Sequence, residues 1–330
     1  MKKIVGALAL VAALSLTACG GGSPSAGVTD DAAPSASGGA AGLEQIEVGV
    51  IPIVDVAPIY LGVKEGIFEK EGLDVKLTLA QGGAAIVPAI TSKQMDFGFS
   101  NVTSMIVARS KGLPLKMVAP GGSSTGNTKE DFAAVMTKPD SDIKEIKDLV
   151  GKKVAVNTLN NISDSTISEA VKKAGGDYTK IQFVEMPFPD MAAQLDAGNV
   201  DAIAAVEPFV TIAGADGNVP VFSNYAEPVK DLTVAVYFTS DDYIKENPET
   251  AAKFTRAMTA SQKFADENPE KAKAVLPDYT TLKPEVIEKL TMPRFLTEVN
   301  EASIQEVAAI SLDRGLIDKV PDMAALLPTK

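Results

Sequence analysis

Histidine and tryptophan are both absent from this chain of 330 residues, and cysteine occurs once, as Cys19. Without histidine the sequence lacks the commonest general base and the commonest metal ligand, which argues against a histidine-dependent hydrolase and against a metal site. A single cysteine cannot form an internal disulfide, so stability must come from a hydrophobic core. We therefore expect a protein that is not an enzyme and that carries no cofactor and no metal.

Basic residues are also in the minority. The chain has 31 Lys and Arg against 43 Asp and Glu, for a net charge of −12, and the basic residues form no block. A protein that binds nucleic acid uses a basic surface to contact phosphates, so we expect no nucleic acid partner. Aromatic residues make up 5% of the chain, and any aromatic wall of a binding site would have to consist of Tyr and Phe.

The first 43 residues have the pattern of an export signal and a linker. Lys2 and Lys3 precede a short apolar run over residues 4–16, which predicts a cleaved signal peptide over residues 1–18 and not a spanning helix. The sequence Leu16-Thr17-Ala18-Cys19 resembles a bacterial lipobox, which implies lipidation of Cys19 and a location on the extracytoplasmic face of the cell membrane. An ordinary secretory signal that ends near a cysteine is the alternative. Residues 19–43 are mostly Gly, Ser, Ala, Pro and Thr, and we expect a flexible linker there.

Short β-branched runs alternate with helical patterns in the rest of the chain. The alternation predicts βαβ units and mostly parallel sheets with helices on both faces. The expected strands are residues 46–51, 75–79, 97–99, 115–119, 153–157, 181–185 and 201–206, and the expected helices are residues 57–64, 84–91, 102–111, 143–149, 163–174 and 191–197. Two further extended runs, residues 132–137 and 232–239, flank the second block, and we expect them to pass between two lobes. Helical patterns dominate after Ser240.

The order of several short motifs resembles a known family. The motifs are Ala57-Pro58-Ile59-Tyr60-Leu61-Gly62, Gly82-Gly83, Asp96-Phe97-Gly98, the segment 148–156, and Gly198-Asn199-Val200-Asp201-Ala202 followed by Glu207-Pro208-Phe209. Together they resemble the solute-binding proteins that serve ABC importers for sulfonates, taurine, nitrate and thiamine-precursor pyrimidines. The resemblance covers most of residues 46–238, while the C-terminal helices agree only in general character.

This resemblance implies an α/β fold of the type II periplasmic-binding-protein class, with two Rossmann-like lobes joined by two crossing strands. Lobe 1 would comprise residues 44–136 and 234–330, and lobe 2 residues 137–233. The implied function is the capture of a small polar organic solute, sulfonate- or taurine-like, between the lobes for delivery to a permease. The implied partners are the solute, the permease and ATPase subunits and the membrane, and we expect a monomer.

Three other functions are weighed against this one. The solute could be a thiamine-precursor pyrimidine or another small nitrogenous or carboxylate compound, and the protein could be a surface sensor instead of an importer subunit. The family also includes pyrimidine-synthesising proteins, which are thought to consume one of their own histidines. A sequence without histidine cannot supply that residue.

Loops at strand ends supply the candidate ligand contacts, because helix starts expose unpaired N–H groups. Such loops contain small and polar residues that also serve as ordinary helix caps and turns. The candidates in these loops are Gly82, Gly83, Ser100, Asn101, Thr158, Asn160, Asn161 and Ser163.

Three further candidates have larger side chains. Asp55 could accept a hydrogen bond from the ligand or cap the helix that follows it, and Tyr60 could offer a hydroxyl or a ring face or belong to the core. Glu207 follows an apolar strand and precedes Pro208, so it could pair with an ammonium, amidine or hydroxyl of the ligand or favour a helix N-terminus. Acidic candidates near a cleft favour a ligand with a positive or hydrogen-bond-donating end, such as taurine or an aminopyrimidine. They count against nitrate or a simple alkanesulfonate.

Overall fold

The computed structural model describes residues 42–329 of the chain, which belong to one compact unit, Gly42–Lys330. The predicted signal peptide, the predicted lipidation site Cys19 and nearly all of the predicted linker lie outside the described residues. Within residues 42–329, no helix is long and apolar enough to cross a membrane.

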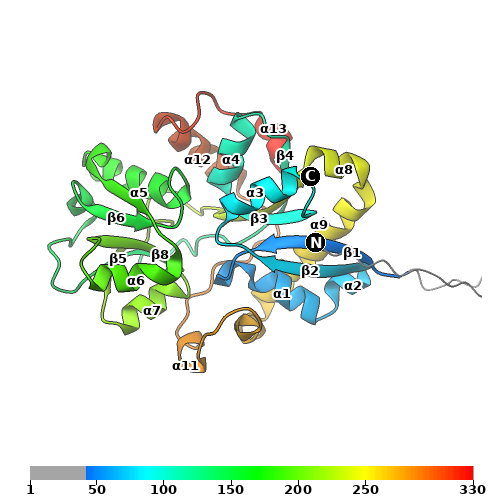
Figure 1. Ribbon diagram of the computed structural model, residues 1–330, viewed down its shortest axis with the longest axis horizontal. Helices are drawn as coiled ribbons and strands as arrows, with labels where there is room; N and C mark the ends of the chain where they lie inside the picture. Colours follow the sequence, from blue (N-terminus) through cyan, green and yellow to red (C-terminus); the bar gives the residue numbers. More distant parts are fainter. Residues whose placement is uncertain (1–41, 330) are drawn as a thin grey trace, which may run out of the picture. The chain divides into compact units, whose positions relative to one another are not determined.

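Two five-stranded sheets form the framework of the unit (Figure 1). The first has the order β2 (Leu73–Leu79), β1 (Glu44–Val50), β3 (Phe97–Asn101), β10 (Ala235–Ser240) and β4 (Leu115–Pro120). The second has the order β7 (Gln182–Glu185), β6 (Lys153–Val156), β8 (Ala202–Val206), β5 (Ala133–Thr137) and β9 (Val219–Phe222). This confirms the α/β fold class, and the predicted lobe boundaries stay a prediction.

Each sheet contains one strand that runs against its neighbours. In the first sheet β1 pairs in parallel with β2 and β3, whereas β10 is antiparallel to β3 and β4. In the second sheet β6 pairs in parallel with β7 and β8, whereas β5 is antiparallel to β8 and β9. The antiparallel strands β10 and β5 are the two extended runs that flank the second block of the sequence. Each belongs to one sheet, and the chain crosses between sheets just before them, over residues 121–132 and 223–234.

The two crossing segments pair with each other. Ser123 and Thr233 form an isolated antiparallel bridge, and the Ser124 N–H donates to the Leu232 carbonyl at 2.9 Å. The carboxylate of Asp131 accepts hydrogen bonds from Ser124 and Ser223 Oγ, both at 2.9 Å. Asp131 therefore joins the two segments through one buried carboxylate.

Helices cover both sheets. They are α1 (Ala57–Lys64), α2 (Ile67–Lys70), α3 (Gly83–Thr91), α4 (Val102–Ser110), α5 (Ile162–Lys173), α6 (Phe188–Asp196), α7 (Phe209–Ala215), α8 (Asp241–Glu246), α9 (Pro248–Glu267), α10 (Pro269–Ala274), α11 (Pro284–Ile287), α12 (Glu301–Asp313) and α13 (Met323–Leu326). In the first sheet's core Phe97 stacks on Phe254 of α9 with ring centroids 3.9 Å apart. The helix predicted over residues 143–149 is wrong in length, because only Ile146–Leu149 forms a 3-10 turn.

Strand ends and helix starts from both sheets meet at one cleft. On the first sheet β1 leads into α1, β2 into α3 and β3 into α4. On the second sheet β6 leads into α5, β7 into α6 and β8 into α7. In sheets of this kind the carboxyl ends of the strands are where ligands bind.

Candidate functional site

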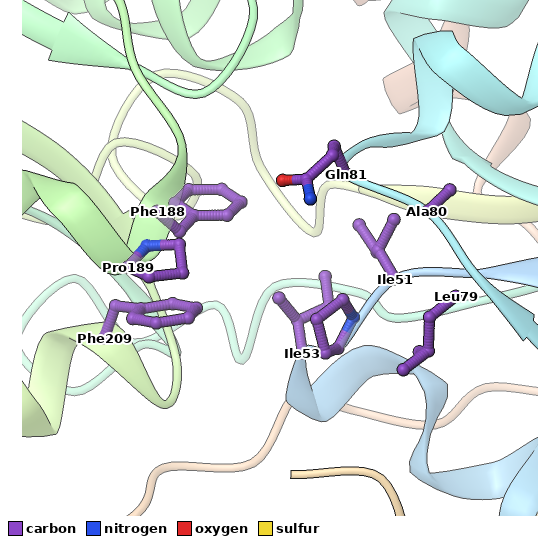
Figure 2. Close-up of a pocket in the computed structure, with 9 residues that line it drawn as sticks. Ile51, Ile53, Leu79, Ala80, Gln81, Phe188, Pro189 and Phe209 are labelled. Carbon is purple, nitrogen blue, oxygen red and sulfur yellow. The ribbon is translucent and has the colours of Figure 1, made fainter. Parts of the chain in front are cut away.

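Two adjoining cavities lie between the two sheets and share Ile51, Ile53 and Phe188 in their walls. The outer cavity has a volume of about 310 Å³, and Figure 2 shows its walls as two facing groups of side chains. One group comes from the loops after β1 and β2, and the other from the starts of α6 and α7. The residues of the outer cavity are Ile51, Pro52, Ile53, Leu79, Ala80, Gln81, Phe188, Pro189 and Phe209.

The inner cavity is small, about 30 Å³, and is more polar. A volume of this size is close to the share of one water molecule in the liquid. Its walls include Asp55, Asn101 and Tyr225 beside the rings of Phe99 and Phe188. Neither cavity has a Lys or Arg among its lining residues. The cleft therefore combines apolar walls with one carboxyl group at its inner end.

Asp55 is 1% exposed, and its Oδ2 atom has no hydrogen-bond partner among the described residues. Burial, assisted by the nearby charge of Asp131, raises the pKa of the Asp55 carboxyl to about 7. Gly122 leaves room for this group, because a Cβ atom at that position would lie 2.5 Å from Asp55 Oδ1. An unsatisfied buried oxygen is costly, so this atom is suited to accept a hydrogen bond from a ligand.

Aromatic rings line both cavities: Phe99, Phe188 and Tyr225 line the inner one, and Phe188 and Phe209 the outer one. Phe188 stacks with Phe209 at a centroid distance of 5.6 Å, and Tyr225 packs against Phe132 at 5.7 Å. The hydroxyl of Tyr225 lies 3.3 Å from Ser163 Oγ at the start of α5. The walls therefore suit a flat apolar group next to a hydrogen-bond acceptor.

Two predicted asparagines cap the helices that face the cleft. Asn101 Oδ1 accepts from the Ser104 N–H at 2.9 Å at the start of α4, and Asn161 Oδ1 accepts from the Ile162 N–H at 2.8 Å at the start of α5. Asn161 Nδ2 also donates to Ser104 Oγ at 2.9 Å, which joins the two sheets' helices directly across the cleft. The same side chain thus caps α5 and bridges the two sides of the cleft.

The glycine pair lies at the mouth of the cleft. Gly82 lines an outer groove of about 870 Å³ with Thr158, and Gly83 lines the inner cavity. A Cβ atom at Gly82 would make ordinary contacts of 3.6 and 3.7 Å with Thr158 and Asn157. A Cβ atom at Gly83 would lie 2.7 Å from the Cα of Ser100 and would also overlap its Oγ. Glycine at position 83 is therefore required for close packing of α3 on β3.

Glu207 and Tyr60 are engaged elsewhere. The Glu207 carboxylate accepts from the Thr211 hydroxyl at 2.8 Å, from the Thr211 N–H at 3.0 Å and from the Thr291 N–H at 3.3 Å, and burial raises its pKa. Tyr60 stacks on Tyr279 with ring centroids 4.0 Å apart. Neither residue is among those that line the cavities described above, and a ligand role for them stays a prediction.

The remaining candidates divide between the cleft and its surroundings. Ser163 contacts Tyr225, and Ser100 is fully buried with an Oγ atom that lacks a partner among the described residues. Asn160 is exposed and has a φ of +53°. The structure thus brings Asp55, Gly83 and Asn101 to the inner cavity, and Gly82 and Thr158 to the mouth.

The aromatic walls were not predicted from the sequence. Phe188 lies between two prolines and begins α6, which follows β7. Phe209 comes directly after a proline and begins α7, which follows β8. That position was a usable signal, because these strand ends belong to the same edge as the predicted loops. Tyr225 lies in a crossing segment, where no periodic pattern shows which way the side chain points. No three His, Cys, Asp or Glu residues of the described part of the chain are grouped so as to hold a metal ion.

Comparisons with known proteins show a family and support the fold. The model of the family described as "NMT1/THI5 like" matches residues 53–272. A formylaminopyrimidine-binding protein from Halalkalibacterium halodurans is 26% identical over 221 residues, which cover 66% of this chain and 64% of that protein. The chain thus spans slightly less than two thirds of that relative.

An enzyme and a solved binding protein are also similar. The 4-amino-5-hydroxymethyl-2-methylpyrimidine phosphate synthase THI13 from Saccharomyces cerevisiae is 22% identical over 72% of this chain and 70% of its own length. The structure of the alkanesulfonate-binding protein SsuA from Xanthomonas axonopodis pv. citri, bound to MOPS, superposes with a TM-score of 0.74. That structure is 17% identical and covers 88% of this chain and 100% of its own, and it supports the fold.

Proposed function

Because the chain belongs to the NMT1/THI5-like family, we propose that it is the solute-binding subunit of an ABC-type importer. The two sheets with their helices close on a small solute, and a permease then receives it. The proposal includes lipidation of Cys19 as the membrane anchor, and monomeric capture of the solute. Its support is the cleft between two sheets of the binding-protein fold, together with relatives that are binding proteins.

The carboxyl group of Asp55 carries the proposal for the solute class. Asp55 lines the inner cavity, its buried Oδ2 atom has no partner among residues 42–329, and no Lys or Arg lines either cavity. A sulfonate or nitrate would bring a negative charge toward this carboxyl group, which costs energy in a buried site. The cleft therefore favours a solute that presents N–H groups.

Taurine and an aminopyrimidine both present such groups. An aminopyrimidine places an N–H donor beside a ring nitrogen acceptor, and a carboxyl group with a pKa of about 7 can pair with both by sharing a proton. Its flat ring suits the outer cavity of about 310 Å³, beside Phe188 and Phe209. The inner cavity has room for about one water molecule, so pairing with Asp55 requires this cavity to widen. Taurine would leave the rings of Phe188 and Phe209 without a planar partner. We therefore propose an aminopyrimidine-like solute in place of the sulfonate- or taurine-like solute first expected.

A synthase activity is the second candidate, because the family includes pyrimidine phosphate synthases. The sequence has no histidine, so the histidine that those enzymes are thought to consume cannot come from this chain. Binding without chemistry is the function that remains supported.

Thermal unfolding of residues 43–330 against a solute panel tests the proposal. The panel holds 4-amino-5-hydroxymethyl-2-methylpyrimidine, a formylaminopyrimidine, taurine, an alkanesulfonate and nitrate. A ligand at about 100 times its Kd adds about 2.7 kcal/mol, so we expect a pyrimidine to raise the midpoint by several degrees. Asp55→Asn should abolish most of this shift, and Asp231→Asn, at a partly exposed carboxylate, should preserve it.

The alternatives give different results. A shift with taurine or the alkanesulfonate alone would contradict the aminopyrimidine class and return the solute to the sulfonate group. A pyrimidine that raises the unfolding midpoint but is not transported by a permease encoded next to this protein's gene would favour a surface sensor.

A further inference from the structure

Helix α12 joins a crossing segment to helix α5 of the second sheet. At its start the Asn300 N–H donates to Thr233 Oγ1 at 2.8 Å, and Ser303 Oγ accepts from the Thr233 N–H at 3.1 Å. At its other end Arg314, the residue after the helix, reaches the start of α5. Figure 1 shows α12 between α4 and α5. The helix and the residue after it thus contact the connection between the sheets and the start of α5.

Arg314 forms a nearly buried ion pair with Asp164. Its Nη1 atom donates to Asp164 Oδ1 at 3.1 Å and to Ser165 Oγ at 2.8 Å. The two charged side chains are 11% and 2% exposed. The guanidinium also lies near the ring of Phe183, with its carbon 5.9 Å from the ring centroid. Since each charge neutralises the other away from water, loss of one would leave the other poorly compensated.

Asp164 in turn fixes the loop before α5. Its Oδ2 accepts from the Asn160 N–H at 2.7 Å, and its Oδ1 from the Asn161 N–H at 2.8 Å. Asn160 has a left-handed φ of +53°, a conformation that needs support from its surroundings. Asn161 then donates to Ser104 on α4 at 2.9 Å. A continuous series of contacts therefore runs from Arg314 through Asp164 and Asn161 to the opposite side of the cleft.

We propose that Arg314 is a positioning residue for solute capture, which holds Asp164 so that Asn161 is placed to close the cleft against Ser104. The consequence for binding rests on the proposed function, while the positioning itself does not. The hydrogen bonds of Arg314 to Asp164 and Ser165 involve none of the residues that line the two cavities, so Arg314 acts through the loop.

A second ion pair offers a matched control. Lys172 of α5 pairs with Asp313 of α12 at 2.7 Å, and both side chains are about half exposed, at 47% and 49%. Lys172→Gln removes one positive charge and one contact between the same two helices. It does not touch Asp164 or the loop. Arg314→Lys keeps the charge but replaces the planar guanidinium by a flexible ammonium, which orients Asp164 and Ser165 less tightly.

Hydrogen–deuterium exchange of the full chain without solute tests the positioning. We expect Arg314→Gln to speed exchange of the Asn160 and Asn161 amides at least tenfold, with Arg314→Lys intermediate and Lys172→Gln unchanged. Equal exchange in Arg314→Gln and Lys172→Gln would overturn the proposal. If Arg314→Gln does not fold, the comparison of Arg314→Lys with Lys172→Gln decides by the same criterion.

Binding of 4-amino-5-hydroxymethyl-2-methylpyrimidine supplies a second measurement. We expect Arg314→Gln and Ser104→Ala each to speed dissociation about tenfold, and the double variant to be no faster than the single variants, because both changes break one series of contacts. Additive effects would mean that Arg314 acts independently of the Asn161–Ser104 bond, and would overturn the proposal. A wild-type protein that does not bind this probe would contradict the proposed solute, and the exchange measurement would still decide the role of Arg314.

Discussion

Asp55, the residue that we propose for solute binding, lies in an environment that costs stability. Its carboxyl group is buried beside Gly122, with one oxygen lacking a partner among the described residues, and its pKa is raised to about 7. A native structure keeps such a group when function requires it, because an unsatisfied buried oxygen costs free energy of folding. The cost depends on whether the group carries a proton.

The raised pKa predicts a pH-dependent stability without solute. The folded protein holds the Asp55 proton up to about pH 7, whereas the unfolded chain releases it near the ordinary value of 3.8, so this group makes the free energy of unfolding fall as the pH rises from 4 to 7. Asp55→Asn should remove this loss. The free energy of unfolding of the variant, relative to that of the wild type, should therefore be higher at pH 8 than at pH 4 by up to about 4 kcal/mol. Urea unfolding of both proteins at pH 4, 6 and 8 measures this. A difference between the two proteins that does not change with pH would contradict it.

At the scale of elements, the contact of α3 with β3 depends on one glycine of an adjacent pair. Gly83→Ala would press a methyl group against Ser100, and overpacking of this kind costs about 1–3 kcal/mol. Gly82→Ala is the matched control, because its methyl group would make ordinary contacts, and we expect a change within about 0.5 kcal/mol. Thermal unfolding of both variants checks this prediction. Equal destabilisation by the two changes would show that close packing at Gly83 is not the reason for glycine there.

The order of strands and helices could be predicted from the sequence, because β-branched runs and helical periodicity are local signals. Strand β9 was missed since it is short and contains Pro220, which is tolerated at the edge of a sheet but weakens a strand signal. The predicted helix over residues 143–149 was too long, because only its second half turns. Local patterns therefore predicted which elements occur better than the residues at which each element begins and ends.

Predictions for the cleft were uneven for a different reason. Asn101 and Asn161 could be found because capping residues precede helices at fixed positions. The pairing of Arg314 with Asp164 joins residues 150 positions apart, and no local pattern indicates it. Glu207 looked free to bind a ligand, but the loop at Thr291 that contacts it is distant in sequence. The ligand roles of all these residues are still predictions.

At the scale of the whole described unit, Asp131 joins the two crossing segments. Its carboxylate accepts from Ser124 and Ser223, one on each segment. Asp131→Ala would leave both buried hydroxyls without this acceptor, and we expect a loss of about 2–4 kcal/mol in the free energy of unfolding. Asp231→Asn, where the carboxylate is 44% exposed, should change it by less than about 1 kcal/mol. Urea unfolding compares them, and a similar loss in both variants would contradict the role of Asp131.

The position of β10 in the first sheet has a consequence for synthesis of the chain. All strands of the second sheet lie between Ala133 and Phe222, whereas β10, which separates β3 from β4, begins at Ala235. During translation all strands of the second sheet are made before β10 of the first sheet. β3 and β4 are therefore synthesised early, but the edges of these strands that pair with β10 stay unpaired until residues 235–240 have been made.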